Sequence, residues 1–352
     1  MKILSSNRII IPKVAFSYAG AIVGAGFTSG QELMQFFVSL ESGIIPALIL
    51  TTALFAVFGW ATLNLSRIYQ STDYGSFLKC LLGPRIAQVF DILISVFLLG
   101  TLGIMMSAAG AVFEEHLGYS FQVGVGFISI CIALVLISDV QGILWLNTVL
   151  MPAKFLIVLI VTVLIVFMPV SSLVAPDIMY IHPEPIGQSW YMASVLYVSY
   201  NLILGLAVLT SLGAANRSPK LSVAGIWGGL GLGAFAAIIV IALINNWPTV
   251  SQYQIPMLFL ASQVHPVVKL LYTLVLVMGI LTTAVACAYT LTIRSMHWIK
   301  SSYGLTLIFI LILAMPLAQF GFARLVHVIY PLFGYAGIIL LGCLAWRTYD
   351  SF

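Results

Sequence analysis

Apolar stretches about as long as a membrane is thick recur along almost the whole chain. One α-helix needs about 20 predominantly apolar residues to cross a bilayer. Ten stretches meet this requirement, and we expect a membrane-spanning helix at each of residues 9–38, 43–66, 86–113, 120–138, 143–168, 188–213, 220–245, 266–293, 303–319 and 323–346. Because a spanning segment must satisfy its backbone hydrogen bonds within itself, the predicted fold class is an all-α polytopic membrane protein with ten transmembrane helices.

Composition excludes a soluble globular protein. Of the 352 residues 62% are hydrophobic and only 7% are charged, with a mean hydropathy of +1.14. The net charge of +4 comes from basic residues near predicted helix ends, so topology explains it better than an anionic partner. We therefore expect membrane lipid and a small-molecule solute as partners and no nucleic acid, and both a monomer and a homodimer remain open.

Loop charges alternate from one predicted helix to the next. The positive-inside rule then assigns to the cytoplasm the ends that carry Lys2, Arg8, Lys13, Arg67, Lys79, Arg85, Arg217, Lys220, Arg294, Lys300 and Arg347. The opposite ends carry Glu41, Glu114, Glu115, Asp177 and Glu184, with Lys269 and Arg324 as the main cations. Both termini are therefore predicted to be cytoplasmic.

The predicted helices divide into two halves within a single membrane domain. Residues 1–168 form a first repeat of five helices, residues 169–187 an extracellular connection, and residues 188–352 a second repeat. Five spans per half invert the second half relative to the first. Residues 246–265 carry two prolines around a moderately apolar stretch and predict a short re-entrant or interfacial helix.

The first apolar stretch is interrupted at bilayer depth by the run Gly24–Glu32. Backbone groups cannot stay unpaired in lipid, so such a break must face protein, water or a ligand. The helix restarting near Phe27 would present free amides and a positive dipole end to a carboxylate. We thus predict solute contacts at Gly24, Ala25, Gly26, Phe27, Thr28, Ser29 and Glu32. The alternative is close helix packing, since Gly26 and Gly30 form a GxxxG pair.

A matching break is expected in the sixth stretch if the repeat is real. Tyr197 to Asn201 lie at mid-depth and are followed by Gly205. Corresponding interruptions in two halves are the best sequence pointer to a transporter site. Ser199, Tyr200 and Asn201 are therefore predicted to contact the solute.

Glu32 and Lys154 lie inside apolar stretches, where a charged side chain is costly and favours a functional role. Glu32 could hold a substrate amine, exchange a proton or gate the outer side, or it could be a structural partner for a tyrosine. Lys154 lies roughly 16 Å from the cytoplasmic start of its helix. Thr282 and Thr283 share that depth, so we predict a coupling role for these three residues. The alternative for Lys154 is snorkelling to the cytoplasmic surface.

Chemistry on a bound substrate is not indicated. The histidines are scattered, the four cysteines stand singly, and no serine has a histidine and an acid nearby in the sequence. We expect no enzyme, no cofactor and no disulfide.

The run from Ala21 to Glu32, AIVGAGFTSGQE, followed by Phe36 and Phe37, resembles the first-helix motif of the YkvI family of bacterial membrane proteins. That family belongs to the amino acid, polyamine and organocation superfamily. The resemblance implies a LeuT-type five-plus-five inverted repeat with broken helices 1 and 6. It also implies a multi-pass protein of the bacterial cytoplasmic (inner) membrane.

The resemblance also implies two competing coupling ions. In sodium-coupled relatives the first and eighth helices hold a cation, and the matching positions here are Gly20, Val23, Gly279, Thr282 and Thr283. In proton-coupled relatives a fifth-helix lysine reaches the same place, and residues 153–156 around Lys154 resemble that segment. A lysine and a sodium ion would repel there, which favours the proton.

These features together predict a secondary active transporter that works by alternating access. An amino acid or related zwitterion is the leading solute class, since the amides suit a carboxylate and Glu32 with Tyr200 and Asn201 suits an amine. The alternatives are a ligand-sensing receptor of the same fold without transport and a sodium-coupled transporter. An ion channel fits the broken helices less well.

Overall fold

The computed structural model describes residues 7–40, 42–71, 73–138, 140–167, 185–187, 189–215, 218–299 and 301–350, and within these ranges it contains helices and no strands. The first apolar stretch forms three pieces, α1 (Asn7–Ile22), α2 (Ala25–Ser29) and α3 (Gln31–Phe36). The other long helices are α4 (Ile44–Tyr69), α6 (Pro84–Val112), α7 (Phe121–Ser138), α8 (Val140–Phe167), α9 (Trp190–Ala215), α10 (Val223–Asn245), α12 (Pro266–Ile299), α13 (Tyr303–Ala318) and α14 (Phe322–Asp350).

Shorter helices stand between some of them. The two short α-helices are α5 (Tyr74–Leu82) and α11 (Pro256–Val264), and a π-helical turn, η2 (Phe113–Leu117), extends α6. Single turns of 3₁₀ helix are η1 (Val38–Leu40), η3 (Pro219–Ser222) and η4 (Thr249–Gln252). The short helix predicted within residues 246–265 is therefore present, as η4 and α11.

The long helices are those of a multi-pass membrane protein. Among the described residues six helices are long and apolar enough to cross a bilayer, namely those at Ile44–Tyr69, Pro84–Leu117, Trp190–Ala215, Pro219–Asn245, Pro266–Met296 and Phe322–Asp350. Three shorter apolar helices lie at Phe121–Ile137, Lys154–Phe167 and Tyr303–Ala318. With the broken first segment, every stretch predicted to span the membrane contains helical structure.

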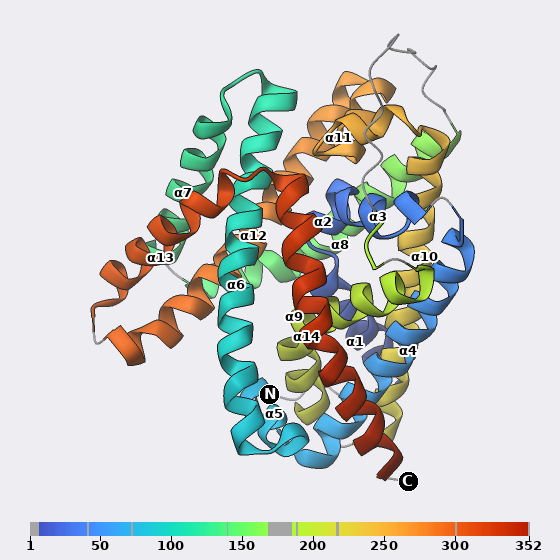
Figure 1. The fold of residues 1–352 in the computed structure, drawn as a ribbon, viewed down its shortest axis with the longest axis vertical. Helices are drawn as coiled ribbons and strands as arrows, with labels where there is room; N and C mark the ends of the chain where they lie inside the picture. The colour runs from blue at the N-terminus through green and yellow to red at the C-terminus, as the bar shows by residue number, and fades with distance from the viewer. Residues whose placement is uncertain are drawn as a thin grey trace.

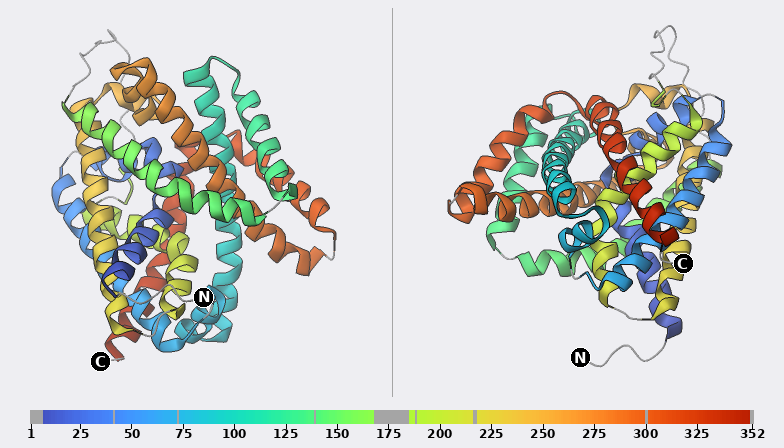
Figure 2. Two further views of the ribbon diagram at one scale, coloured as in Figure 1. Left: turned by 180° about the vertical axis from the view of Figure 1, so that it is seen from behind. Right: turned by 60° about the horizontal axis from the view of Figure 1, so that its bottom comes forward.

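The helices form two groups that lie side by side. α1, α4, α9 and α10 pack together on one side, α6, α7, α12 and α13 on the other, and α14 contacts both α6 and α9 (Figure 1). The short helix α5 and the last turns of α14 lie at one end of the molecule, and α11 lies at the opposite end. Figure 2 shows the same arrangement from behind and from below.

Closely spaced glycines bring α10 against α4. A Cβ atom on Gly225 would overlap the backbone of Gly59, and one on Gly229 would overlap the backbone of Ala56. The two helix backbones therefore touch without intervening side chains, as small residues permit in membranes.

The predicted break in the sixth stretch is wrong, because α9 is one continuous helix through Ser199, Tyr200 and Asn201. Two of the polar side chains there donate to carbonyl groups of the preceding turn, whereas the Tyr200 hydroxyl donates to Glu32. The Ser199 hydroxyl donates to the Leu196 carbonyl at 2.9 Å, and the Asn201 amide donates to the Tyr197 carbonyl at 2.9 Å. Side chains that bond back to the preceding turn let a polar run stay helical.

Part of the sequence-based topology lies outside the described residues. Of the predicted connection at residues 169–187 only 185–187 are described. The charged residues Lys2, Glu41, Asp177, Glu184, Arg217 and Lys300 lie outside as well.

Candidate functional site

The first helix is interrupted where the glycines predicted it. α1 ends at Ile22, α2 begins at Ala25, and Gly24 between them is extended, with φ −91° and ψ −169°. A second interruption at Gly30 has a φ of 81°, a conformation that favours glycine, and separates α2 from α3. The expected single half-helix is therefore two pieces of five and six residues, and its dipole is correspondingly short.

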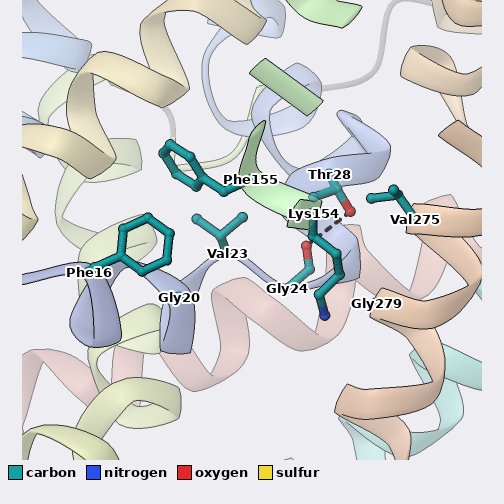
Figure 3. Close-up of a pocket in the computed structure, with 9 residues that line it drawn as sticks. All are labelled: Phe16, Gly20, Val23, Gly24, Thr28, Lys154, Phe155, Val275 and Gly279. Atoms are coloured by element: carbon teal, nitrogen blue, oxygen red, sulfur yellow. Dashed lines mark hydrogen bonds between the residues drawn. The ribbon is translucent and has the colours of Figure 1, made fainter. Parts of the chain in front are cut away.

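Lys154 of α8 reaches this break. Its side chain is only 7% exposed, and its Nζ donates a hydrogen bond to Oγ1 of Thr282 on α12 at 3.2 Å. Figure 3 shows the side chain extending between Gly24 and Gly279. Lys154 therefore does not snorkel to the surface but bridges α8 and α12 beside α1.

The positions proposed for sodium surround the same ammonium group. A small cavity of about 10 Å³, room for about one water, is lined by Gly20, Val23 and Gly279 together with Lys154. Thr282 Oγ1 lies 3.2 Å from the Gly279 carbonyl oxygen, and Thr283 Oγ1 lies 3.7 Å from the place of a Cβ on Gly24. All five positions thus cluster about Lys154.

A larger cavity of about 290 Å³ extends from the break toward α5. Its walls come from the end of α1 and from α6, α9 and α12, and its far side is bounded by Tyr74 of α5. The lining residues are Gly20, Ala21, Ile22, Val23, Gly24, Tyr74, Ile94, Phe97, Leu98, Lys154, Ile203, Leu204, Leu206, Ala207, Val208, Thr282, Thr283, Ala286, Cys287 and Thr290. Lys154 is the one charged side chain among them.

Glu32 lies on the other side of the break and does not line this cavity. The carboxylate is 4% exposed and accepts a hydrogen bond from the Tyr200 hydroxyl at 2.8 Å. Tyr330 of α14 stacks on Tyr200, with ring centroids 4.6 Å apart. The carboxylate covers Gly26 so closely that a Cβ there would overlap it. Of the roles considered for Glu32, the structure therefore contains the hydrogen bond to a tyrosine.

Most of the predicted solute contacts are buried in helix packing. Of these residues, Gly24 and Thr28 line the two cavities described above. Phe27 stacks on Phe235 with centroids 5.5 Å apart, and Ser29 donates to the Gly26 carbonyl at 2.7 Å. Ala25, Gly26, Ser199, Tyr200 and Asn201 are buried as well.

The cavity wall includes residues that sequence reasoning missed. Phe97 and Cys287 are apolar residues in apolar helices, and nothing in the sequence distinguishes them from lipid-facing neighbours. Near Tyr74, Asp91 forms an ion pair with Arg294, whose guanidinium lies 5.4 Å from the Tyr74 ring centroid. This pair forms because α6 packs along α12. Burial raises the pKa of the Tyr74 hydroxyl, which keeps it neutral.

Neither a metal cluster nor a disulfide is seen in the described part of the chain. No three histidine, cysteine or acidic side chains gather there, and the four cysteines are free.

The fold is that of LeuT-type transporters. A mutant form of the manganese transporter of Eremococcus coleocola superposes with a TM-score of 0.57 at 14% identity, covering 97% of this chain and 78% of the transporter. Mhp1 in its inward-facing conformation superposes with a TM-score of 0.54 at 16% identity, covering 95% of this chain and 75% of Mhp1. These solved neighbours are membrane transporters rather than enzymes.

Comparison with known sequences assigns the chain to one family of membrane proteins. No protein-family model matches the chain. The uncharacterized protein YyaD of Bacillus subtilis (strain 168) is 30% identical over 329 residues, which are 92% of this chain and 93% of YyaD. The uncharacterized membrane protein YkvI of the same organism is 30% identical over 345 residues, 94% of either chain. The chain belongs to the family of YkvI and YyaD, as the first-helix motif predicted.

Proposed function

We propose that this protein is a secondary active transporter that moves a small carboxylate-bearing solute by alternating access. The observation that carries the proposal is the one-sided cavity. It reaches the α1–α2 break from the end where α5 lies, whereas contacts close the break toward the end of α11. By the charge pattern, the open end faces the cytoplasm of a bacterial inner membrane.

Several hydrogen bonds close the opposite end. The Tyr272 hydroxyl of α12 donates to the Thr28 carbonyl at 2.6 Å, and the Gln35 amide donates to the Ala323 carbonyl of α14 at 2.8 Å. Glu115 of the π-helical turn accepts the backbone N–H of Gln254, just before α11, at 2.8 Å. These contacts would have to open for a solute to enter from outside.

Alternating access is further supported by the similarity of the two ends. α5 packs against α6, α9 and α14, and α11 packs against α12, α2 and α8. These are corresponding partners if α1 to α8 and α9 to α14 are inverted repeats. The pairs α4 with α9 and α10 with α1 correspond in the same way. Rocking about such a centre can open one end while it closes the other.

Lys154 is proposed as the proton-coupling group. A lysine ammonium has three donors, and the structure gives it one protein acceptor, Thr282. A sodium ion about 4 Å away would repel the ammonium by about 4 kcal/mol at an effective dielectric constant of about 20. Protonated Lys154 and bound sodium therefore exclude one another, which supports proton coupling over the sodium alternative.

The solute carboxylate would meet Lys154 and the amides that begin α2. An amino acid, the class first suggested by the sequence, additionally needs Glu32 to release Tyr200. One solved neighbour carries manganese by its name, but no cluster of metal ligands is present among the residues described here, so we do not extend manganese transport to this protein.

Uptake into proteoliposomes tests the proposal. With radiolabelled amino acids and monocarboxylates as probes, accumulation should follow an inward proton gradient and stay unchanged when choline replaces sodium. Lys154→Met should abolish gradient-driven accumulation, and Lys79→Met, on an exposed face of α5, should leave it intact.

Two results would overturn parts of this proposal. Uptake that stops without sodium would instead assign a sodium site to Gly20, Val23, Gly279, Thr282 and Thr283. Binding of a probe without uptake or exchange would favour the ligand-sensing receptor.

A further inference from the structure

The buried charge of Lys154 has no counter-charge among the described residues. The whole sequence has ten acidic residues, and none of those described lines the cavity. Near Tyr74, at the side of the cavity away from the helix break, Asp91 forms an ion pair with Arg294. The remaining titratable groups on the cavity wall are Tyr74 and Cys287. The cavity therefore carries an excess of one positive charge whenever Lys154 is protonated.

A buried ammonium with one hydrogen bond attracts an anion. Removing a cation from water costs several kcal/mol unless an opposite charge and further hydrogen bonds compensate it. Thr282 supplies one acceptor, and its hydroxyl is neutral. A bound carboxylate would complete the charge balance, with the Thr283 hydroxyl on the cavity wall as an additional donor.

An ammonium group on the same solute would find no carboxylate. Glu32 is separated from the cavity by an aromatic layer. Phe97 lines the cavity and its ring centroid lies 6.3 Å from that of Tyr330, which in turn stacks on Tyr200. Tyr200 donates a hydrogen bond to Glu32. The acid is thus held behind the wall and already satisfied.

The rest of the wall suits an apolar body. The side chains of Ile94, Leu98, Ile203 and Leu206 line the cavity opposite Lys154 and offer no hydrogen bonds. With a volume of about 290 Å³, the cavity has room for a small organic solute.

We propose that the solute is a small monocarboxylate with an apolar body and no ammonium group, and that its carboxylate pairs with Lys154. The proposal rests on the transport function proposed above and specifies its substrate class. If Lys154 brings the proton, a proton and a monoanion move together and carry no net charge. A zwitterion moved with a proton would instead carry one positive charge.

Binding by the purified protein tests the substrate class directly. The probes are straight and branched monocarboxylates of four to eight carbons, each with its 2-amino counterpart and with the amine that lacks the carboxylate. Thermal stabilisation and titration calorimetry should show binding of at least one carboxylate. Its 2-amino counterpart should bind at least about tenfold more weakly, because its ammonium stays unpaired. The amine should not bind.

The variant Lys154→Met should lose carboxylate binding, whereas Lys79→Met should keep it. Since the ligand series uses the unaltered protein, it decides the question even if Lys154→Met fails to fold. Equal or tighter binding of the 2-amino members would overturn the monocarboxylate inference and leave the transport proposal standing. Binding of no member, together with no uptake in proteoliposomes, would overturn both.

Membrane potential supplies an independent measurement. With the best-binding carboxylate, the initial uptake rate should not change when a potassium gradient with valinomycin makes the liposome interior negative. Acceleration by that potential would show net positive charge movement and would contradict the inference, even though transport itself would be demonstrated.

Discussion

At the scale of single residues, the most costly group on the closed side of the break is the carboxylate of Glu32. The Tyr200 hydroxyl of α9 donates a hydrogen bond to it, and Gly26 leaves room for it. An unpaired carboxylate at this depth would cost several kcal/mol. Glu32 therefore ties α3 to α9 through Tyr200, and this bond helps to close the break on the side away from the cavity.

Removing one hydroxyl should weaken that closure measurably. Tyr200→Phe keeps the ring but deletes the 2.8 Å hydrogen bond to Glu32. We expect a loss of about 1–2 kcal/mol in the free energy of unfolding, in line with hydrogen bonds between membrane helices and to charged groups. The midpoint of thermal unfolding in detergent, followed by intrinsic fluorescence, measures the loss.

Tyr335→Phe is the matched control, because Tyr335 is exposed on α14. Gly26→Ala should destabilise as Tyr200→Phe does, since its methyl group would displace the Glu32 carboxylate. The two changes together should cost less than their sum, because they disrupt one contact. Full additivity, or a stability of Tyr200→Phe equal to that of the parent protein, would contradict this account.

Residue positions were predicted from the sequence better than residue partners. Counting 1.5 Å per residue placed Lys154 and Thr282 at one depth, and the two side chains do touch. The same counting could not find Tyr330 or Phe97, because an aromatic residue in an apolar helix has no distinguishing pattern. It also could not show that Glu32 is already paired with Tyr200, because that depends on how α3 and α9 are rotated.

At the scale of elements, the first and sixth stretches show what a helix break requires. In the first, Gly24 is extended and Gly30 has a positive φ, so the backbone itself departs from the helix. In the sixth, the side chains of Ser199 and Asn201 donate to carbonyl groups of the preceding turn, and α9 continues. The glycines therefore predicted the break in the first stretch correctly. Hydroxyl and amide side chains are compatible with a broken helix and with a continuous one, so they did not predict the structure of the sixth stretch.

The contact between α4 and α10 should be intolerant of side-chain bulk. A Cβ on Gly229 would overlap the backbone of Ala56, so Gly229→Leu must push the two helices apart. We expect little or no monodisperse protein on size-exclusion chromatography after detergent extraction.

Gly231 is the matched control on the same helix, because a Cβ there would meet nothing within 4 Å. Gly231→Leu should elute like the parent protein and unfold within a few degrees of it. If Gly229→Leu behaves as well as Gly231→Leu, the close approach of these helices is not needed for folding.

At the scale of the whole molecule, the positions of the helices followed from apolar length alone, and the LeuT-type fold agrees with the resemblance found in the first helix. The way in which the helices of the two halves pack could not be predicted from the lengths of the apolar stretches. It depends on contacts such as that between Gly229 and α4, which no periodicity shows. The orientation of the chain in the bilayer stays a prediction from charge.

Impermeant thiol reagents test the orientation and the open end together. In a variant without native cysteines, Ser42→Cys should be labelled from outside intact cells and Ser218→Cys only from the cytoplasmic side. Ala286→Cys, on the cavity wall, should share the accessibility of Ser218→Cys, because the cavity extends toward α5. Labelling of Ala286→Cys from the side of Ser42 would show that the cavity opens outward.

The hydrogen bonds that define the site join residues far apart in the sequence, and this bears on how the protein is made. Lys154 meets Thr282 across 128 residues, Glu32 meets Tyr200 across 168, and Gln35 meets Ala323 across 288. During synthesis the first half must therefore wait in the membrane with its lysine and glutamate unpaired. A chain that ends before Thr282 lacks the hydroxyl that accepts from Lys154, and we expect such a truncated chain to be less stable in the membrane than the full chain.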